Sequence, residues 1–433
     1  MSESGLAAAT KPKDKIKHQT IDTMVFMILW LQQMLCPDIV MWKRDFRKAF
    51  RCIPIMRDHL VYAWVTFKWE GHYRAACHLG CPFGAVASCW NWHRMGNFVE
   101  MVLRRLFRVS VMRYVDDLAG VGKRVVWNGG MVLTNISLLL GIITDPSKDA
   151  DECMAMTLLG IQISIMKAGA LLQLDAEKAA RWAIHLEELL DLRTCEVGFA
   201  SKIAGRLSFA VCTCTDKIGR AYLRPFFQQA VSPRLYITPN FRWACRFFLW
   251  YLRMRPPVFK GLSAQRPVHV AWSDASGPDK MICGIVRLAD GNYSYYYTEV
   301  PERIMEQFNK REDHYIGLLE TLALLVTITT FQTELAGGLV LGFVDNQGAL
   351  HSVLRATSRA AETEIMVAEF WKVCTVAQIG FSGWRVESKA NVADGPTRNY
   401  FRDVVDELSA QFRQPVFPQF LQDLWRHPVI PEV

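Results

Sequence analysis

The sequence predicts an α/β protein in which two stretches of mixed strands and helices are separated by a mostly helical segment. Short apolar runs alternate with helical patterns in residues 21–126, and the alternation starts again at residue 268 and continues to about residue 398. Between them, residues 166–265 carry apolar side chains at helical spacing. Strands interleaved with helices favour sheets that are covered by helices. A chain of 433 residues is long enough for two to four domains.

Composition places the chain among globular intracellular proteins. Hydrophobic residues make up 51% of the sequence and aromatic residues 12%, which excludes a disordered chain. Twelve cysteines without a secretory leader indicate reduced thiols and a cytoplasmic or nuclear location. The apolar run 24–31 is shorter than the ~20 residues of a membrane span, so it predicts a core helix and no membrane partner. Two clusters hold possible zinc ligands, but neither has a second pair at zinc-site spacing, which favours ordinary buried thiols: Cys77, His78 and Cys81, and Cys212 and Cys214.

Charge is divided unevenly along the chain. The net charge is +8, but residues 1–265 contain 35 Lys and Arg against 21 Asp and Glu, a balance of +14. Residues 266–433 contain 15 against 21, a balance of −6. The densest basic stretch, 197–260, holds eleven Lys and Arg and a single acidic residue, Asp216. A basic half suits phosphate binding, because neutralised phosphates release counterions. A solvated basic face is the alternative.

Three aspartates in the basic half form the first candidate site. Asp116 and Asp117 follow the apolar strand 110–113, and Asp45 lies at the end of the strand 39–42. Adjacent carboxylates repel, so the pair is costly unless a cation is present. Because neighbouring strand residues point to opposite faces, a tight hairpin is needed to bring both to one site. On spacing alone such a pair is more often a surface turn, whereas with Asp45 it predicts a hard-oxygen site for two magnesium ions.

The order of motifs in this half resembles the palm of a reverse transcriptase. The matching segments, in the family's order, are 45–50, 79–84 followed by Ser88, 114–117, and Lys148 followed by 158–161. The resemblance implies an RNA-directed DNA polymerase that uses an RNA template, a DNA primer and deoxynucleoside triphosphates. It also implies that Asp45 and Asp116 bridge two Mg²⁺ or Mn²⁺ ions, with Asp117 more peripheral. The residues implied to bind substrate and template are Phe50, Pro82, Phe83, Gly84, Tyr114 and Lys148.

Phe50 stands five residues after Asp45, where the family places an aromatic gate. A flat ring beneath the sugar would leave no room for a 2′-hydroxyl and would select deoxynucleotides by a steric clash. A single Phe is more often a core residue, and its position relative to Asp45 favours the gate instead.

Four carboxylates in the acidic half form the second candidate site. Two of them follow apolar strands, and a third is a lone carboxylate among leucines, which is expensive without a partner. Convergence of the four would hold a metal pair able to cleave a phosphodiester. They are Asp274 after the strand 268–273, Glu320 in the helix 314–328, Asp345 after the strand 338–344 and Asp394 near a helix start in 391–396.

The order Asp, Glu, Asp, Asp and the run 388–398 resemble a ribonuclease H domain of the retroelement type. The resemblance implies two Mg²⁺ or Mn²⁺ ions on Asp274, Glu320, Asp345 and Asp394, and cleavage of the RNA strand of an RNA–DNA hybrid. Many ribonucleases H carry a histidine in the loop before the last aspartate, whereas residues 387–389 are Glu-Ser-Lys here.

The basic stretch between the two sites resembles the thumb and connection of DIRS-like retroelement reverse transcriptases, through residues 202–209 and 219–225. Its helices could follow a duplex backbone from one site to the other. An amphipathic bundle with a solvated basic face stays open as the alternative. The candidate nucleic-acid-binding residues are Lys202, Arg206, Arg220 and Arg224.

The complete interpretation is a polymerase palm with a helical thumb and connection, followed by a ribonuclease H-like α/β domain. Only 44 residues precede Asp45, where the family has a fingers subdomain of about 100 residues, in keeping with ordinary domain sizes. The resemblance therefore implies truncated fingers and weak primer extension. The alternatives are a degenerate nucleic-acid-binding remnant and a chain with ribonuclease H activity alone; the oligomeric state is left open. The expected segments are 1–38 leader and residual fingers, 39–165 palm, 166–265 thumb and connection, 266–400 ribonuclease H-like domain and 401–433 tail.

Overall fold

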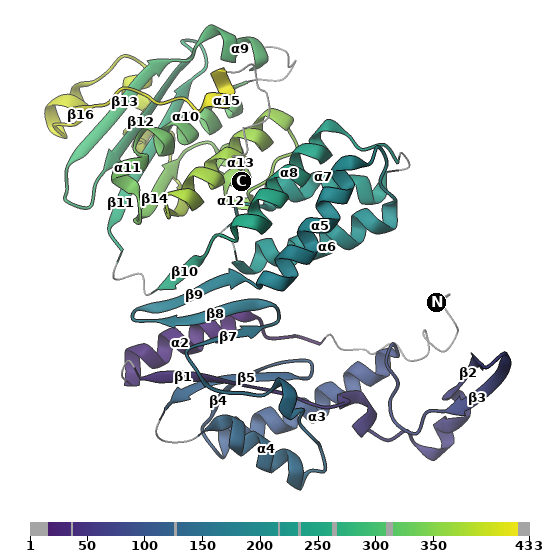
Figure 1. Ribbon diagram of the computed structural model, residues 1–433. Coiled ribbons are helices and arrows are strands. Elements are labelled where there is room, and N and C mark those ends of the chain that lie inside the picture. The colour runs from purple at the N-terminus through teal and green to yellow at the C-terminus, as the bar shows by residue number, and fades with distance from the viewer. Residues whose placement is uncertain are drawn as a thin grey trace. The chain divides into compact units, whose positions relative to one another are not determined.

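The computed structural model describes residues 16–35, 38–124, 128–214, 217–232, 235–261, 266–308 and 315–422. The chain forms two compact units (Figure 1): residues 1–172 with 259–262, and residues 173–258 with 263–433. Each unit contains a β-sheet with helices packed against it, so the mixed α/β class expected from the sequence is confirmed. The first 15 residues of the expected leader and the part of the expected tail beyond residue 422 lie outside the described residues.

The first unit is built on a four-stranded antiparallel sheet in the order β4-β5-β1-β6. Helices α3 and α4 cover one face of this sheet, and α2 covers the other (Figure 1). The β1–β5 register places Asp45 opposite Asp117. The bounds are α2 Ile21–Leu35, β1 Ile39–Asp45, α3 Val86–Arg105, β4 Ser110–Tyr114, β5 Asp117–Lys123, α4 Gly129–Leu139 and β6 Ala150–Cys153.

Large apolar side chains fix the helices on this sheet. Trp42 of β1 and Phe46, the residue after that strand, pack with Trp92 of α3 and Leu133 of α4 in one buried cluster. The ring centroids of Phe46 and Trp92 lie 5.1 Å apart in an edge-on arrangement, which is a favourable aromatic geometry. The cluster holds the strand that carries Asp45 against α3.

Helix α2 is part of this unit's core, although the sequence placed it in the leader segment. Met24, Ile28 and Leu31 recur at helical spacing and are buried. The apolar run 24–31 is thus the core helix that its length predicted.

The remainder of the first unit contains short helices, the hairpin β2–β3 and a second four-stranded sheet. In that sheet, ordered β10-β9-β8-β7, Leu159 and Gly160 form a two-residue turn with φ of 54° and 81°, the conformation that such hairpins need. The other bounds are η1 Ala49–Cys52, η2 Arg57–Tyr62, β2 Trp64–Trp69, β3 His72–Cys77, η3 Pro146–Lys148, β7 Ala155–Leu158, β8 Ile161–Met166, β9 Gly169–Leu174 and β10 Val258–Gly261. The division between the units falls inside β9 and β10.

Four helices open the second unit and lie within residues 166–265, the segment expected to be thumb and connection. Their interior is aromatic: Tyr222 stacks on Phe247 at 3.6 Å between ring centroids. Helix α7 packs against α13 of the following domain, so the helices belong to the same compact unit as that domain. The strands β9 and β10 occupy the ends of the segment that the sequence assigned wholly to the thumb and connection. The bounds are α5 Ala176–Asp191, α6 Val197–Cys214, α7 Arg220–Val231 and α8 Pro239–Met254.

A six-stranded sheet in the order β15-β14-β11-β12-β13-β16 forms the centre of the rest of unit 2. Helix α10 is buried along nearly its whole length and packs on β11 and β12, with α12 and α13 beside it (Figure 1). A sheet with helices packed on it is the mixed α/β structure that the sequence predicted for this segment. The bounds are β11 Val268–Ser276, β12 Met281–Arg287, β13 Tyr293–Glu299, α9 Glu302–Phe308, α10 Ile316–Thr330, α11 Gln332–Leu335, β14 Leu339–Val344, α12 Gln347–Arg355, α13 Ala361–Val376 and β15 Gly380–Arg385.

The segment beyond residue 400, expected to be a tail, contributes to this sheet. Strand β16 pairs with β13 in parallel, and Arg413 donates a backbone hydrogen bond to Tyr295. The backbone N–H of Val416 donates a further hydrogen bond to Thr330 Oγ1 at the end of α10. The last elements are η5 Ser388–Ala390, α14 Asp394–Thr397, η6 Asp403–Glu407, β16 Gln411–Phe412 and α15 Gln419–Gln422.

Through the described part of the chain, every helix is too short or too polar to cross a lipid bilayer.

Candidate active sites

Two parallel strands and one buried helix bring three carboxylates together in the second unit. Strands β11 and β14 pair in parallel with Ser273 opposite Val344, so the residues that follow, Asp274 and Asp345, emerge side by side. Glu320 approaches from α10, which packs on β11. One oxygen from each of the three carboxylates lies within 4.8 Å of the others. The structure therefore joins three of the four carboxylates that the sequence singled out.

Because the cluster is buried, its negative charges cost free energy when no cation is bound. Asp274 is 3% exposed and Glu320 is 4% exposed. Desolvation, reinforced by the charges of Asp274 and Asp345, raises the pKa of Glu320 from 4.5 to about 9. Desolvation also raises the pKa of Asp274 to about 6, although a hydrogen bond from Thr397 opposes the shift. At neutral pH Glu320 therefore holds a proton when no cation is bound.

The donor atoms of this cluster fit a divalent metal ion. Glu320 Oε2 and Asp345 Oδ1 are buried, and neither has a hydrogen-bond donor among the described residues. Buried acceptors without a donor are rare and unfavourable in folded proteins, and carboxylate oxygens are the ligands that Mg²⁺ and Mn²⁺ prefer. A cation bound between them would complete their coordination and offset the repulsion.

Asp394 lies near the cluster but turns toward a different partner. It begins α14, and its carboxylate contributes to the raised pKa of Asp274. Its Oδ1 accepts hydrogen bonds from Arg398, with an ion-pair distance of 2.8 Å. It is absent from the group of three close carboxylates.

Three polar residues that the sequence did not single out hold the aspartates in place. Thr397 Oγ1 donates to Asp274 Oδ2 at 2.7 Å, and Asn391 Nδ2 donates to Asp274 Oδ1 at 3.3 Å. Ser388 Oγ donates to Asp345 Oδ2 at 2.7 Å. All three belong to the run 388–398. The resemblance of that run to a ribonuclease H domain was the sequence feature that could have pointed to them.

The raised pKa values predict an unusual dependence of stability on pH when divalent metal is removed. Because Asp274 and Glu320 have pKa values of about 6 and about 9 in the folded state, against 3.8 and 4.5, the folded protein keeps protons that the unfolded chain releases. The free energy of unfolding should be highest near pH 4 and should fall as pH rises toward about 9. Urea unfolding in a chelator across this range measures the slope. Glu320→Gln should flatten its upper part, and an unchanged slope would contradict this assignment.

A tight hairpin carries the aspartate pair of the first unit. Strands β4 and β5 are joined by a two-residue turn, Val115-Asp116, and Val115 has φ of 54°. This conformation strains a β-branched residue by about 1–2 kcal/mol. Its carbonyl accepts hydrogen bonds from Trp92 Nε1 at 2.7 Å and Arg113 Nη1 at 2.8 Å. The surrounding side chains thus hold a strained turn whose tip presents Asp116.

Lysines neutralise the other two aspartates of this site. Lys148 Nζ lies 2.6 Å from Asp45 Oδ2, and Lys43 Nζ lies 3.3 Å from Asp117 Oδ1. Burial raises the pKa of Asp117 despite Lys43. Burial also raises the pKa of Asp116, with smaller contributions from the charges of Asp45 and Asp117. The three carboxylates therefore act on one another and attract cations. Lys43 was not singled out from the sequence.

Four of the other residues expected to bind substrate, Phe50, Pro82, Phe83 and Gly84, lie on two adjoining segments. Phe50 and Phe83 have ring centroids 5.2 Å apart. Backbone hydrogen bonds join 53–55 to 79–81, which ties the segment after Asp45 to the one that contains Pro82 and Gly84. Tyr114 is 38% exposed at the end of β4.

The four expected nucleic-acid-binding residues differ in their surroundings. Lys202 and Arg220 are exposed, whereas Arg206 is half-buried. Arg224 is engaged within the protein: its guanidinium donates to the carbonyls of Ser358 and Arg359. Arg224 thus has a structural contact, and we keep the expectation of duplex contacts for the other three.

No protein-family model and no curated protein matches the sequence. Among solved structures, the chain is similar to the foamy viral protease-reverse transcriptase in complex with an RNA/DNA hybrid. The identity is 15% and the TM-score 0.42, over 85% of this chain and 46% of that one. A second foamy viral protease-reverse transcriptase structure, with double-stranded DNA, shows 15% identity and a TM-score of 0.41, over 87% of this chain and 72% of that one. The chain thus spans about half the length of the first of these structures.

Proposed function

We propose that the chain is a metal-dependent nuclease of the ribonuclease H type, which cleaves the RNA strand of RNA–DNA hybrids at Asp274, Glu320 and Asp345. The observation that carries this proposal is the group of three carboxylates within 4.8 Å, in which one oxygen of Glu320 and one of Asp345 have no hydrogen-bond donor among the described residues. Such a group is unfavourable unless it binds cations. The carboxylate oxygens of the three residues suit Mg²⁺ or Mn²⁺, and we propose that the site binds two such ions.

The protein's own groups have separate tasks in this reaction. Asp274, Glu320 and Asp345 would hold the metal, and Asp394 would join them by leaving Arg398. Bound metal supplies Lewis-acid activation of water and charge stabilisation at the phosphate. Thr397 and Asn391 orient Asp274 from α14 and the loop before it, so the oxygens of Asp274 are held in place. Glu320 would have to give up its proton to serve as a ligand.

We propose a second activity, RNA-directed DNA synthesis, at the aspartates of the first unit. The strained turn at Val115 and the pairing of Asp45 opposite Asp117 favour it over a surface turn, because strain of this kind persists mainly at functional sites. Asp45, Asp116 and Asp117 would hold two metal ions, and an RNA template, a DNA primer and deoxynucleoside triphosphates are the proposed substrates. A retroelement origin of the DIRS-like type belongs to the same proposal and rests on residues 202–209 and 219–225.

Sugar selection tests the polymerase site through Phe50. Its ring packs beside Phe83 close to the strand that ends at Asp45. In a form of the chain that extends primers, Phe50→Ala should raise incorporation of ribonucleotides relative to deoxynucleotides at least about tenfold, because the ring no longer excludes the 2′-hydroxyl. Single-nucleotide extension measures the ratio. Phe67→Ala, at an exposed aromatic residue of β2, is the matched control, and equal discrimination in both variants would remove Phe50 from the gate role.

The decisive experiment for the nuclease is cleavage of a hybrid labelled on its RNA strand. The folded chain should cleave that strand with Mg²⁺ or Mn²⁺ and stop when the metal is chelated. The same RNA as a single strand, and the matching DNA duplex, are the substrate controls. A folded protein that binds the hybrid and cleaves nothing with either metal would favour the degenerate remnant.

A further inference from the structure

A polar cavity lies in the first unit, beside the edge strand β4, and its lining contains none of the candidate catalytic carboxylates. Its walls come from the segment before α2, from α3 and from Arg113 of β4. His93, Asn97, Glu100 and Arg104 recur every three or four residues, so they share one face of α3. The cavity volume is about 370 Å³, within the range of about 300–1,000 Å³ that is usual for small-molecule sites.

Two buried charged residues form the fixed part of this cavity. Arg113 is 4% exposed and Glu100 is 8% exposed, with 3.6 Å between Arg113 Nε and Glu100 Oε2. Gln19 joins them, because its Nε2 donates to Glu100 and its Oε1 accepts from the backbone N–H of Arg113. Gly96 leaves the room that the guanidinium fills, since a Cβ there would lie 2.7 Å from Arg113. The segment before α2 is thus tied to α3 and β4 at the cavity.

Positive charge exceeds negative charge in the lining. Four cations, Lys17, Arg104, Arg105 and Arg113, stand against one carboxylate, a balance of +3. That carboxylate, Glu100, is shared between Arg104, at 3.0 Å, and Arg113. Arg113 Nε is buried and has no hydrogen-bond acceptor among the described residues, which is rare and unfavourable for a buried donor. A surplus of cations around one cavity favours an anion there.

Two of these cations are free to bind such an anion. Lys17 and Arg105 are exposed, and neither side chain has an ion pair or a hydrogen bond with another described residue. His93 adds a donor: burial lowers its pKa, so the ring is neutral, and because Nδ1 accepts from Arg113, Nε2 carries the proton. An ammonium group, a guanidinium fork and an N–H donor together match the oxygens of a phosphate.

We propose that this cavity binds the phosphate group of a small molecule, with Lys17 and Arg105 as its main cationic contacts. The proposal is independent of both proposed activities, because it involves neither set of metal-binding carboxylates. Inorganic phosphate and the phosphate of a mononucleotide share the chemistry that the cavity recognises. Inorganic phosphate fills only part of the volume, and Asn97 and Met101 line the cavity as well, so a mononucleotide is a second possible source.

Thermal unfolding of the full chain in increasing inorganic phosphate tests the proposal. Constant ionic strength and the absence of divalent metal isolate the effect of phosphate, and the shift gives an apparent dissociation constant. Lys17→Gln and Arg105→Gln should each raise this constant about tenfold, because each removes a hydrogen bond to a charged group. Both side chains are exposed, so the variants should fold. Arg94→Gln, at an exposed arginine of α3 outside the cavity, is the matched control and should bind as the unaltered chain does.

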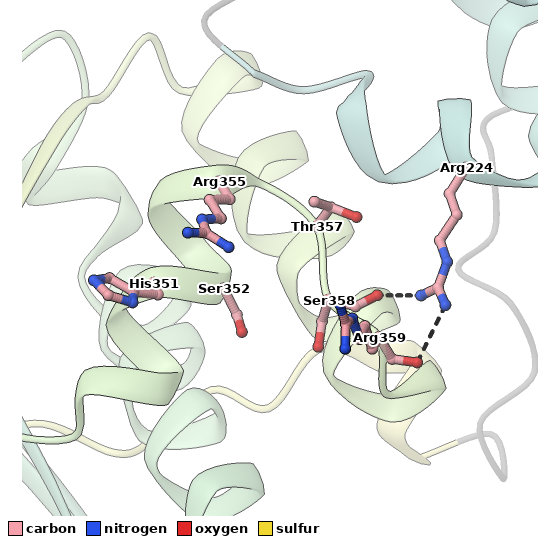
Figure 2. A pocket seen from close by; sticks show the side chains of 7 residues that line it. All are labelled: Arg224, His351, Ser352, Arg355, Thr357, Ser358 and Arg359. Atoms are coloured by element: carbon pink, nitrogen blue, oxygen red, sulfur yellow. Dashed lines mark hydrogen bonds between the residues drawn. The ribbon is translucent and has the colours of Figure 1, made fainter. Parts of the chain in front are cut away.

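Two results would overturn the proposal. Phosphate stabilises many proteins through exclusion from their surfaces, and this general effect is the same in every variant. Equal responses of Lys17→Gln, Arg105→Gln and Arg94→Gln would therefore leave no specific site. The second unit has a basic cavity of its own, at the end of α12 around Arg355 and Arg359 (Figure 2). If Arg355→Gln abolished the response and both variants of the first unit kept it, phosphate would bind at that other cavity.

Deoxyadenosine monophosphate and deoxyadenosine separate the two sources of phosphate. Monophosphate binding at least about tenfold tighter than inorganic phosphate, and weakened in Lys17→Gln and Arg105→Gln, would identify a mononucleotide site. Equal affinities would identify a site for free phosphate, and either result supports the proposal. Deoxyadenosine that bound as tightly as its monophosphate would overturn the role of the phosphate group. The proposal would also fail if the two variants weakened binding of an RNA–DNA hybrid and left the response to phosphate unchanged.

Discussion

Asp345→Asn should abolish cleavage of the RNA strand, with a loss of at least about 10³-fold, or ~4 kcal/mol in the activation barrier. The substitution keeps the shape of the side chain and removes the charge of a proposed metal ligand. Asp345 Oδ1 is buried and has no hydrogen-bond donor among the described residues, so a cation is the partner that would balance the charge of this carboxylate. Initial rates of hybrid cleavage at saturating metal measure the effect.

The matched control for this variant is Asp406→Asn. Asp406 is exposed in η6 of the same unit and undergoes the same chemical change. It should cleave at the rate of the unaltered chain. The metal-free Asp345→Asn protein should also be at least as stable as the original, since one of the repelling charges beside Glu320 is gone. Cleavage at more than about a tenth of the original rate would remove Asp345 from the metal site.

Asp116→Asn should reduce primer extension and leave hybrid cleavage nearly unchanged, because Asp116 belongs to the other unit. In a form of the chain that extends primers, extension should fall at least about 10³-fold, while hybrid cleavage stays within about twofold. The turn at Val115 tolerates the change, since asparagine adopts turn conformations as readily as aspartate. Primer extension and hybrid cleavage are measured on the same preparation.

Asp58→Asn serves as the control for the first unit. Asp58 is exposed in η2, where the same change removes one negative charge. Both activities should be unaffected there. If Asp116→Asn lowered cleavage as strongly as extension, the two carboxylate clusters would not be independent sites. If it left extension intact, Asp116 would not be a metal ligand.

Local sequence determined the elements that carry the two sites. Apolar runs followed by a carboxylate predicted the strands before Asp274 and Asp345, because period-two and continuous apolar patterns depend only on near neighbours. The helix around Glu320 was predicted in the same way, and it is α10. The aspartate pair also demanded a tight hairpin, and the turn at Val115 is that hairpin.

Tertiary structure decided which side chains meet. The hydrogen bonds from Asn391 and Thr397 to Asp274 join residues 117 and 123 positions apart, a separation that no local pattern encodes. Arg224 lies in a basic stretch typical of phosphate binding, yet the packing of α7 on α13 directs it to a carbonyl pair 134 and 135 residues away.

The segment that contains β16 also could not be predicted from local sequence patterns. Strand β16 has two residues, Gln411 and Phe412, too few for a period to be recognised, and the prolines that follow are typical of a tail. Its place in the sheet depends on the free edge of β13, to which it adds main-chain hydrogen bonds. The sequence by itself thus determined the two sets of acidic residues and the strands and helices that bear them. Only the tertiary structure decided their neighbours, because burial, hydrogen-bond partners and charge compensation come from segments far apart in the chain.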